Sequence, residues 1–133
     1  MIIFVMINKN REKLNHAIKD LSKLPFVYAI ILFGSQIKGN AREDSDIDIA
    51  VLTKKVLNEK EETNIFGFSS EKFDISLFHK LPLIIQFRII RDGKVAFCRD
   101  EKYFHEIKFN TIRQYLDFSG FINNFYRKVI ENV

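Results

Sequence analysis

Apolar residues near the start of the chain recur at the spacing of one helix face. The positions i, i+3, i+4, i+7 and i+10 are occupied by Leu14, Ala17, Ile18, Leu21 and Leu24. This period predicts an amphipathic helix. Asn10 is a suitable N-cap, and Pro25 is expected to end the helix because a residue before proline disfavours helical geometry.

The next segments have the patterns of β-strands. Residues 27–33 form a continuous apolar run between Pro25 and Gly34, which favours a buried strand. In residues 47–52 and 72–78 apolar side chains alternate with polar ones, which predicts strands with one buried face. Asp48 and Asp74 both occupy the polar phase of this alternation, so each is expected on the face opposite its apolar neighbours.

Helical segments separate and follow the later strands. Residues 58–63 are compatible with a helix that stops before the glycine and serines of 67–70, and residues 83–90 predict a helix that stops at Asp92-Gly93. A short fourth strand is expected at 95–98, and helix from about residue 101 to the end. The last part of this helix carries an apolar stripe, for which packing within the chain is the favoured interpretation over an interface. Its members are Phe118, Phe121, Ile122, Phe125 and Val129.

The fold expected from this order is α/β (α+β), with a small mixed sheet flanked by helices and a C-terminal helical segment. The chain has 133 residues, so we expect a single domain, 1–133, with a catalytic core at about 11–98 and the helical segment at about 101–133. The apolar run 1–7 is too short to span a bilayer and lacks the features of a signal peptide. An edge strand or a wrongly chosen start codon accounts for it.

Composition and charge limit the cellular compartment and the classes of binding partner that we expect. Cys98 is the only cysteine, which excludes an internal disulfide and favours a reducing, cytoplasmic location. The net charge of +4 arises entirely after residue 78, where ten basic residues face six acidic ones. A modest solvated excess of this size is the commoner outcome, and we expect no stable nucleic-acid binding from it.

Three carboxylates carry the candidate chemistry. Asp46 and Asp48 are two apart on one strand, so their side chains project from the same face. If the strand that carries Asp74 is adjacent, all three converge. Such a cluster raises the pKa of its members unless a cation compensates it, and carboxylate oxygens suit Mg²⁺. Two such ions can activate an attacking oxygen and neutralise leaving pyrophosphate.

A phosphate-binding element precedes the carboxylates. Gly34-Ser35 ends a buried strand and leads into an expected helical turn at 36–38. Glycine allows close approach of the backbone, and the Ser35 hydroxyl and N–H can hold a phosphate at a helix N-terminus. Lys38 and Arg42 are candidates for further phosphate contacts. Each feature alone has a commoner explanation, as a turn or as a solvated Asp; their combination favours a site.

The segment from Gly34-Ser35 to Asp46-Ile47-Asp48, with its gap of ten residues, resembles the signature of the minimal nucleotidyltransferases of the polymerase-β-like superfamily. Asp74 matches the family's third carboxylate. The resemblance implies a polymerase-β-like fold in which Asp46, Asp48 and Asp74 are catalytic residues and metal ligands. It also implies that Gly34 and Ser35 bind the triphosphate of ATP.

Many members of this family are antitoxins that transfer AMP from ATP to a tyrosine of a HEPN-domain RNase toxin. The resemblance therefore implies an adenylyltransferase with that partner, with Mg²⁺ as cofactor, in a hetero-oligomer or a homodimer and without a membrane. A protein acceptor is favoured over a polynucleotide because the chain has no room for large additional domains. Two alternatives remain open: an antitoxin that masks its toxin by binding alone, and nucleotidyl transfer to a small molecule.

Overall fold

A four-stranded mixed sheet forms the centre of the described chain, with the strand order β3-β2-β1-β4. The computed structural model describes residues 9–34, 47–54, 56–70 and 72–131. Strand β1 (Val27–Phe33) pairs antiparallel with β2 (Ile47–Thr53) and with β4 (Lys94–Cys98). Strand β3 (Phe73–Leu77) pairs parallel with β2. The four strands predicted from the sequence are confirmed, with ends that differ by one residue at most.

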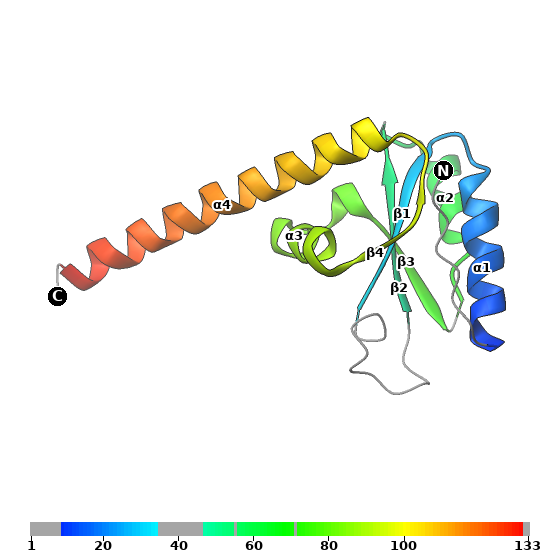
Figure 1. The fold of residues 1–133 in the computed structure, drawn as a ribbon, viewed down its shortest axis with the longest axis horizontal. Coiled ribbons are helices and arrows are strands. Elements are labelled where there is room, and N and C mark those ends of the chain that lie inside the picture. Colours follow the sequence, from blue (N-terminus) through cyan, green and yellow to red (C-terminus); the bar gives the residue numbers. More distant parts are fainter. Residues whose placement is uncertain (1–8, 35–46, 55, 71, 132–133) are drawn as a thin grey trace.

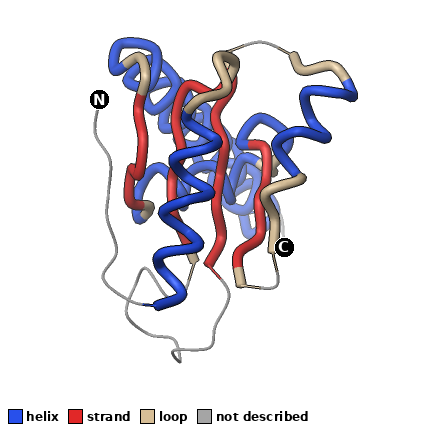
Figure 2. Tube along the Cα trace, turned by 90° about the vertical axis from the view of Figure 1, so that its right-hand side faces the viewer, coloured by secondary structure: helices blue, strands red, loops and turns tan. Residues whose placement is uncertain are grey.

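Helices cover both faces of this sheet, as Figure 1 shows. Helices α1 (Lys9–Ser22) and α2 (Glu59–Phe66) lie on one face, and α3 (Leu83–Asp92) and α4 (Glu101–Glu131) lie on the other. A short 3₁₀ helix, η1 (Phe78–Lys80), follows β3. In Figure 2 the sheet is seen with α1 in front of it. The expected fold class is confirmed: a mixed sheet flanked by helices with a long C-terminal helix.

Alternation along the strands divides the core into two clusters. Leu32 of β1 and Ile49 of β2 pack with Leu14, Ile18 and Leu21 of α1 in the first cluster. The second cluster lies towards α3 and α4, and its members are Ala29, Ile31, Ala50, Leu52, Phe78, Ile89, Cys98 and Phe104. Cys98 is buried in β4. The two clusters hold a helix layer against each face.

Local signals account for most helix ends. The side chain of Asn58 accepts a hydrogen bond from the backbone N–H of Glu61 at 2.8 Å, and the Glu61 carboxylate accepts one from the backbone N–H of Asn58 at 3.1 Å. These two bonds cap the start of α2. Gly67 and Gly93 end α2 and α3. The prediction for Asn10 is wrong: Lys9 already belongs to α1, so Asn10 lies in the first turn and not at the N-cap.

Helix α4 extends far beyond the body (Figure 1). Its first part is anchored by the buried Phe104 and Thr111, and Tyr115 stacks on Phe87 of α3 at 3.9 Å between ring centroids. Beyond Tyr115 the favoured prediction of packing within the chain is wrong, because Phe121 is 67% exposed and Phe125 56% exposed. A helix of 31 residues is about 46 Å long, which exceeds the width of a four-stranded sheet.

Several sequence predictions lie outside the described residues. These are the apolar run 1–7, the turn at 36–38, and the site residues Ser35, Lys38, Arg42 and Asp46. Of the helices that the structure describes, none has both the length and the apolarity needed to cross a bilayer.

Candidate active site

The candidate site lies at the edge of the sheet where β1 ends and where β2 and β3 begin. In the antiparallel pair, Phe33 at the end of β1 is the partner of Asp48. In the parallel pair, Asp48 is the direct partner of Asp74. Neighbouring strands are about 4.8 Å apart, and paired residues point to the same face. The adjacency on which the convergence of Asp48 and Asp74 depends is therefore present.

Both carboxylates face the layer of α3 and α4. Ile47 and Ile49, the neighbours of Asp48, belong to the cluster beneath α1, so Asp48 points the other way. Asp74 likewise lies between the buried Phe73 and Ile75 and is itself exposed. Asp48 is partly exposed. The pair is therefore accessible to a ligand on the α3 side of the sheet.

Gly34 is shaped for close contact with Asp48. Its φ of +102° lies in a region that L-residues rarely adopt. A Cβ at this position would lie 2.6 Å from Oδ2 of Asp48. Both the backbone conformation and the space thus require glycine, and the absent side chain leaves room beside the carboxylate.

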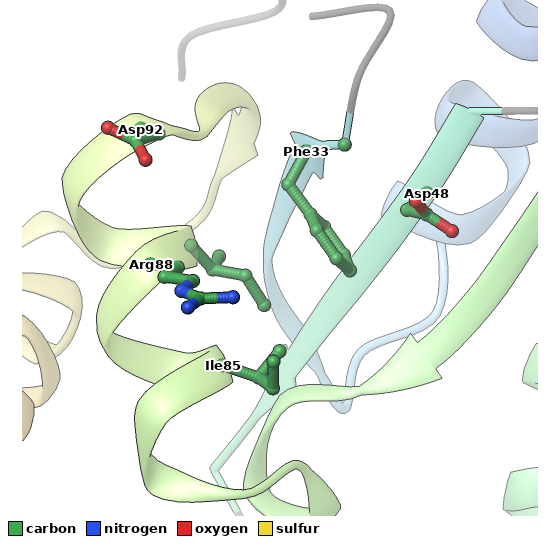
Figure 3. Close-up of a pocket in the computed structure, with 7 residues that line it drawn as sticks. Phe33, Asp48, Ile85, Arg88 and Asp92 are labelled. Carbon is green, nitrogen blue, oxygen red and sulfur yellow. The ribbon is translucent and has the colours of Figure 1, made fainter. Parts of the chain in front are cut away.

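A cleft of about 320 Å³ opens between these strand ends and α3. Phe33, Gly34 and Asp48 line the side of the strands. Helix α3 supplies the opposite side, and its lining residues are Ile85, Arg88, Ile89 and Asp92. Figure 3 shows Arg88 reaching from α3 into the cleft towards Phe33. The cleft therefore has the carboxylate of Asp48 on the strand wall, and the guanidinium of Arg88 with the carboxylate of Asp92 on the helix wall.

The two arginines of α3 are in different electrostatic situations. Arg88 forms no hydrogen bond or ion pair with another described residue, whereas Arg91 donates two hydrogen bonds to the carboxylate of Asp92, at 3.1 and 2.9 Å. The hydrogen bonds and charge of Asp92 raise the pKa of Arg91 above its ordinary value. Arg88 is thus available to an anion in the cleft, and Arg91 is already paired with a protein anion.

Sequence reasoning did not assign Arg88 and Asp92 to the site. A signal was present: Ile85, Arg88, Ile89 and Asp92 follow the spacing i, i+3, i+4 and i+7, so two charged residues share a face with two apolar ones. Only the position of α3 against the strand ends shows that this mixed face borders the cleft.

The chemistry of the described residues fits a divalent cation. Paired carboxylates on adjacent strands offer the hard oxygen ligands that Mg²⁺ prefers, and the missing side chain of Gly34 avoids a collision with Oδ2 of Asp48. Within the described ranges no group of three acidic, His or Cys side chains gathers. The third expected carboxylate, Asp46, lies outside those ranges.

Comparison with known proteins agrees with this geometry. The model of the family described as "Polymerase beta, Nucleotidyltransferase" matches residues 5–102. A protein of Methanocaldococcus jannaschii, named as a candidate protein adenylyltransferase, is 32% identical over 105 residues, which is 66% of this chain and 84% of the relative. The protein adenylyltransferase MntA of Aphanizomenon flos-aquae is 34% identical over 96 residues, 61% of this chain and 63% of the relative.

Solved structures share the fold. The crystal structure of a toxin–antitoxin pair with AMP-PNP contains a chain with a TM-score of 0.68 and 21% identity, covering 93% of this chain and 99% of that one. A structure of a tri-AMPylated HEPN toxin of Shewanella oneidensis with its MNT antitoxin gives 0.63 and 20%, covering 90% and 94%. With the family model matching well over half of its length, this chain belongs to the polymerase beta nucleotidyltransferase family.

Proposed function

We propose that this chain is a Mg²⁺-dependent protein adenylyltransferase, an antitoxin that transfers AMP from ATP to a tyrosine of a partner HEPN-domain RNase toxin. The observation that carries the proposal is the register that pairs Asp74 with Asp48, which lines a cleft together with Gly34. The names of the two relatives as protein adenylyltransferases support the choice of AMP and of a protein acceptor. The complexes of similar fold support a HEPN-domain partner.

Each site residue has a distinct role in the proposal. Asp46, Asp48 and Asp74 would hold two Mg²⁺ ions, which supply charge neutralisation on the triphosphate and on the leaving pyrophosphate. Gly34 and Ser35 would hold the triphosphate through backbone N–H groups, and Lys38 and Arg42 would add charge contacts to it. For Ser35, Lys38, Arg42 and Asp46, which lie outside the described ranges, the proposed roles rest on the sequence motif alone.

Arg88 is added to this set from the cleft. Among the described residues Arg88 has no hydrogen-bond or ion-pair partner, and it lines the same cleft as Asp48, which is proposed to hold a metal–triphosphate complex; its guanidinium is suited to bidentate contact with phosphate oxygens. It would stabilise negative charge as the phosphate bond breaks. Arg91 serves no such role because Asp92 already occupies it.

The reaction is an in-line displacement at the α-phosphorus. The tyrosine hydroxyl oxygen forms a bond to that phosphorus, and the bond from the phosphorus to the bridging oxygen breaks, releasing pyrophosphate. Asp74 is exposed beside Asp48 on the neighbouring strand, and in this proposal it accepts the hydroxyl proton as general base. The cleft walls position the two reacting atoms, which is the main contribution that the protein makes to such transfers.

The test measures AMP on the partner protein. The HEPN-domain protein encoded beside this gene is incubated with this chain, ATP and Mg²⁺, and its intact mass is recorded. We expect the mass of one or more AMP groups to be added, and none with the Asp46→Asn/Asp48→Asn variant or with EDTA. No addition with ATP, GTP, CTP or UTP would overturn the transferase proposal.

A second candidate is an antitoxin that masks its partner by binding alone. The exposed apolar face of α4 supports this candidate, because such a surface could bind and cover the partner without any transfer of AMP. The same double variant separates the two candidates. Full neutralisation of the RNase by a variant that cannot transfer AMP would favour masking.

A further inference from the structure

The exposed half of α4 continues a helix face that is buried in its first half. We call the five residues Phe118, Phe121, Ile122, Phe125 and Val129 the α4 stripe. At 100° per residue, the stripe lies on the same face as Phe104, Ile107 and Thr111, which pack against the body. The apolar seam is therefore continuous along α4. Its first half packs against the body of the protein, and no part of the described chain packs on its second half.

All three phenylalanines of the stripe are at least half exposed: Phe118 at 53%, Phe121 at 67% and Phe125 at 56%. Single exposed apolar residues are ordinary on a protein surface, but a contiguous aromatic row is typical of an interaction site. The projecting half also lacks the tertiary packing from which most helices in proteins gain their stability. Both points indicate an occupant along this face.

The position of α3 relates the stripe to the cleft. The stack of Phe87 on Tyr115 is where the buried half of the seam ends, so an occupant of the stripe begins beside α3. Arg88, the next residue of α3, lines the cleft. Helices α3 and α4 both lie on the sheet face to which Asp48 and Asp74 point (Figure 1). An occupant is thus on the same side of the molecule as the proposed chemistry.

The size of the stripe favours a protein acceptor over the other possible occupants. From Phe118 to Val129 it is about 17 Å long, which exceeds the reach of a nucleotide or a small acceptor. A second copy held by this stripe alone would contribute five residues a side, against roughly 20–30 in a stable interface. An acceptor protein can supply the rest of that area, because it must also contact the cleft for its hydroxyl to react.

We propose that the α4 stripe is the docking surface for the acceptor protein, which lays a helix with an apolar seam along it. Docking there places the acceptor beside α3, with its reactive hydroxyl directed to the cleft. The inference rests on the proposed adenylyl transfer to a protein, and adds to it the surface by which that protein is selected. The stripe acts through binding and contacts none of the reacting atoms.

The test compares two double variants of the same helix. Phe121→Glu/Phe125→Glu places two charges on the stripe, and Asn123→Glu/Asn124→Glu places the same charges on the opposite face of the same turns. The probe is the HEPN-domain protein encoded beside this gene, with its affinity measured by calorimetry and AMP transfer measured by intact mass. AMP-PNP affinity in the presence of Mg²⁺ serves as the check on the cleft.

We expect the stripe variant to bind the acceptor at least about 30-fold more weakly, because aromatic anchors of an interface each carry a large share of the affinity. Its AMP-PNP affinity and the acceptor affinity of the asparagine variant should match those of the wild type. Equal acceptor binding by both variants would overturn the inference. So would a wild-type dimer that the stripe variant dissociates without loss of acceptor binding, because the occupant is then a second copy.

The two proposals fail in distinguishable ways. If the wild type binds the acceptor through the stripe but adds no AMP to it, the adenylyl transfer is refuted and the docking surface stands. If the wild type transfers AMP and the stripe variant transfers it with an unchanged KM for the acceptor, the docking surface is refuted and the transferase stands.

Discussion

Replacing Gly34 by Ala tests the geometry at the centre of the site. The substitution adds a Cβ 2.6 Å from Oδ2 of Asp48, and it does so at a φ of +102°. The backbone conformation costs roughly 1–3 kcal/mol for a residue with a side chain. The contact must also open by roughly half an ångström or more to reach ordinary van der Waals separation. Because the contacted atom ends a side chain, the Asp48 carboxylate is the group that moves.

The effect on rate follows from that displacement. A shift of about 1 Å in a catalytic group can lower the rate by about 100-fold. We therefore expect Gly34→Ala to reduce the rate of AMP transfer by about that factor and the free energy of unfolding by about 1–3 kcal/mol. Transfer is measured by intact mass over time, and stability by urea unfolding.

Gly120→Ala is the matched control. A Cβ at Gly120 meets no atom within 4 Å, and the residue is in the interior of α4. Alanine there should raise helix stability by about 0.5–1 kcal/mol and leave transfer unchanged. A Gly34→Ala protein that is as active and as stable as the wild type would refute the reasoning about Asp48.

Three further predictions concern α3, β4 and α2. Arg88→Gln should weaken AMP-PNP·Mg²⁺ binding by about 10-fold or more, whereas Arg91→Gln should change the affinity by less than about twofold. Calorimetry on both variants measures the affinities, and equal values would show that Arg88 does not belong to the site. Burial raises the pKa of the Cys98 thiol above its ordinary 9.0. The thiol in the folded protein should therefore react with a disulfide reagent at pH 8 far more slowly than the thiol of the urea-unfolded chain. The protonated thiol also contributes to the free energy of unfolding below the pKa of the unfolded chain, and this contribution should be lost as the pH rises through the pKa of the folded protein. Asn58→Ala removes the capping box of α2 and should lower the free energy of unfolding by about 1 kcal/mol. Urea unfolding measures this difference, and an unchanged free energy of unfolding would contradict the prediction.

Local physics explains why so many elements were predictable from the sequence. The run 27–33 is apolar throughout and bounded by turn residues, so its limits as a strand could be read directly, and they match β1. The polar phases of Asp48 and Asp74 also follow from alternation alone, because successive strand side chains point to opposite faces. These are properties of a few neighbouring residues, and the rest of the chain does not alter them.

The start of α1 and the ends of α2 show the limit of such signals. Asn10 has the right chemistry for an N-cap, but the helix already includes Lys9. For α2, the helix-compatible pattern covered residues 58–63 with a break at 67–70, and the helix fills the interval by continuing to Phe66 and burying Ile65 completely. Tertiary burial of that side chain stabilises an additional turn that propensity alone does not require.

By itself, the sequence determined the order of the strands along the chain, their phase and the family motif, and it predicted Asp74 as the third carboxylate. Tertiary structure alone decided that β3 lies next to β2 in the register that sets Asp74 opposite Asp48, and that Arg88 borders the cleft. It also decided that no part of the described chain packs over the exposed phenylalanines in the second half of the α4 seam. The physical reason is the same in each case: periodicity specifies which side chains share a face, but only packing specifies what lies against that face.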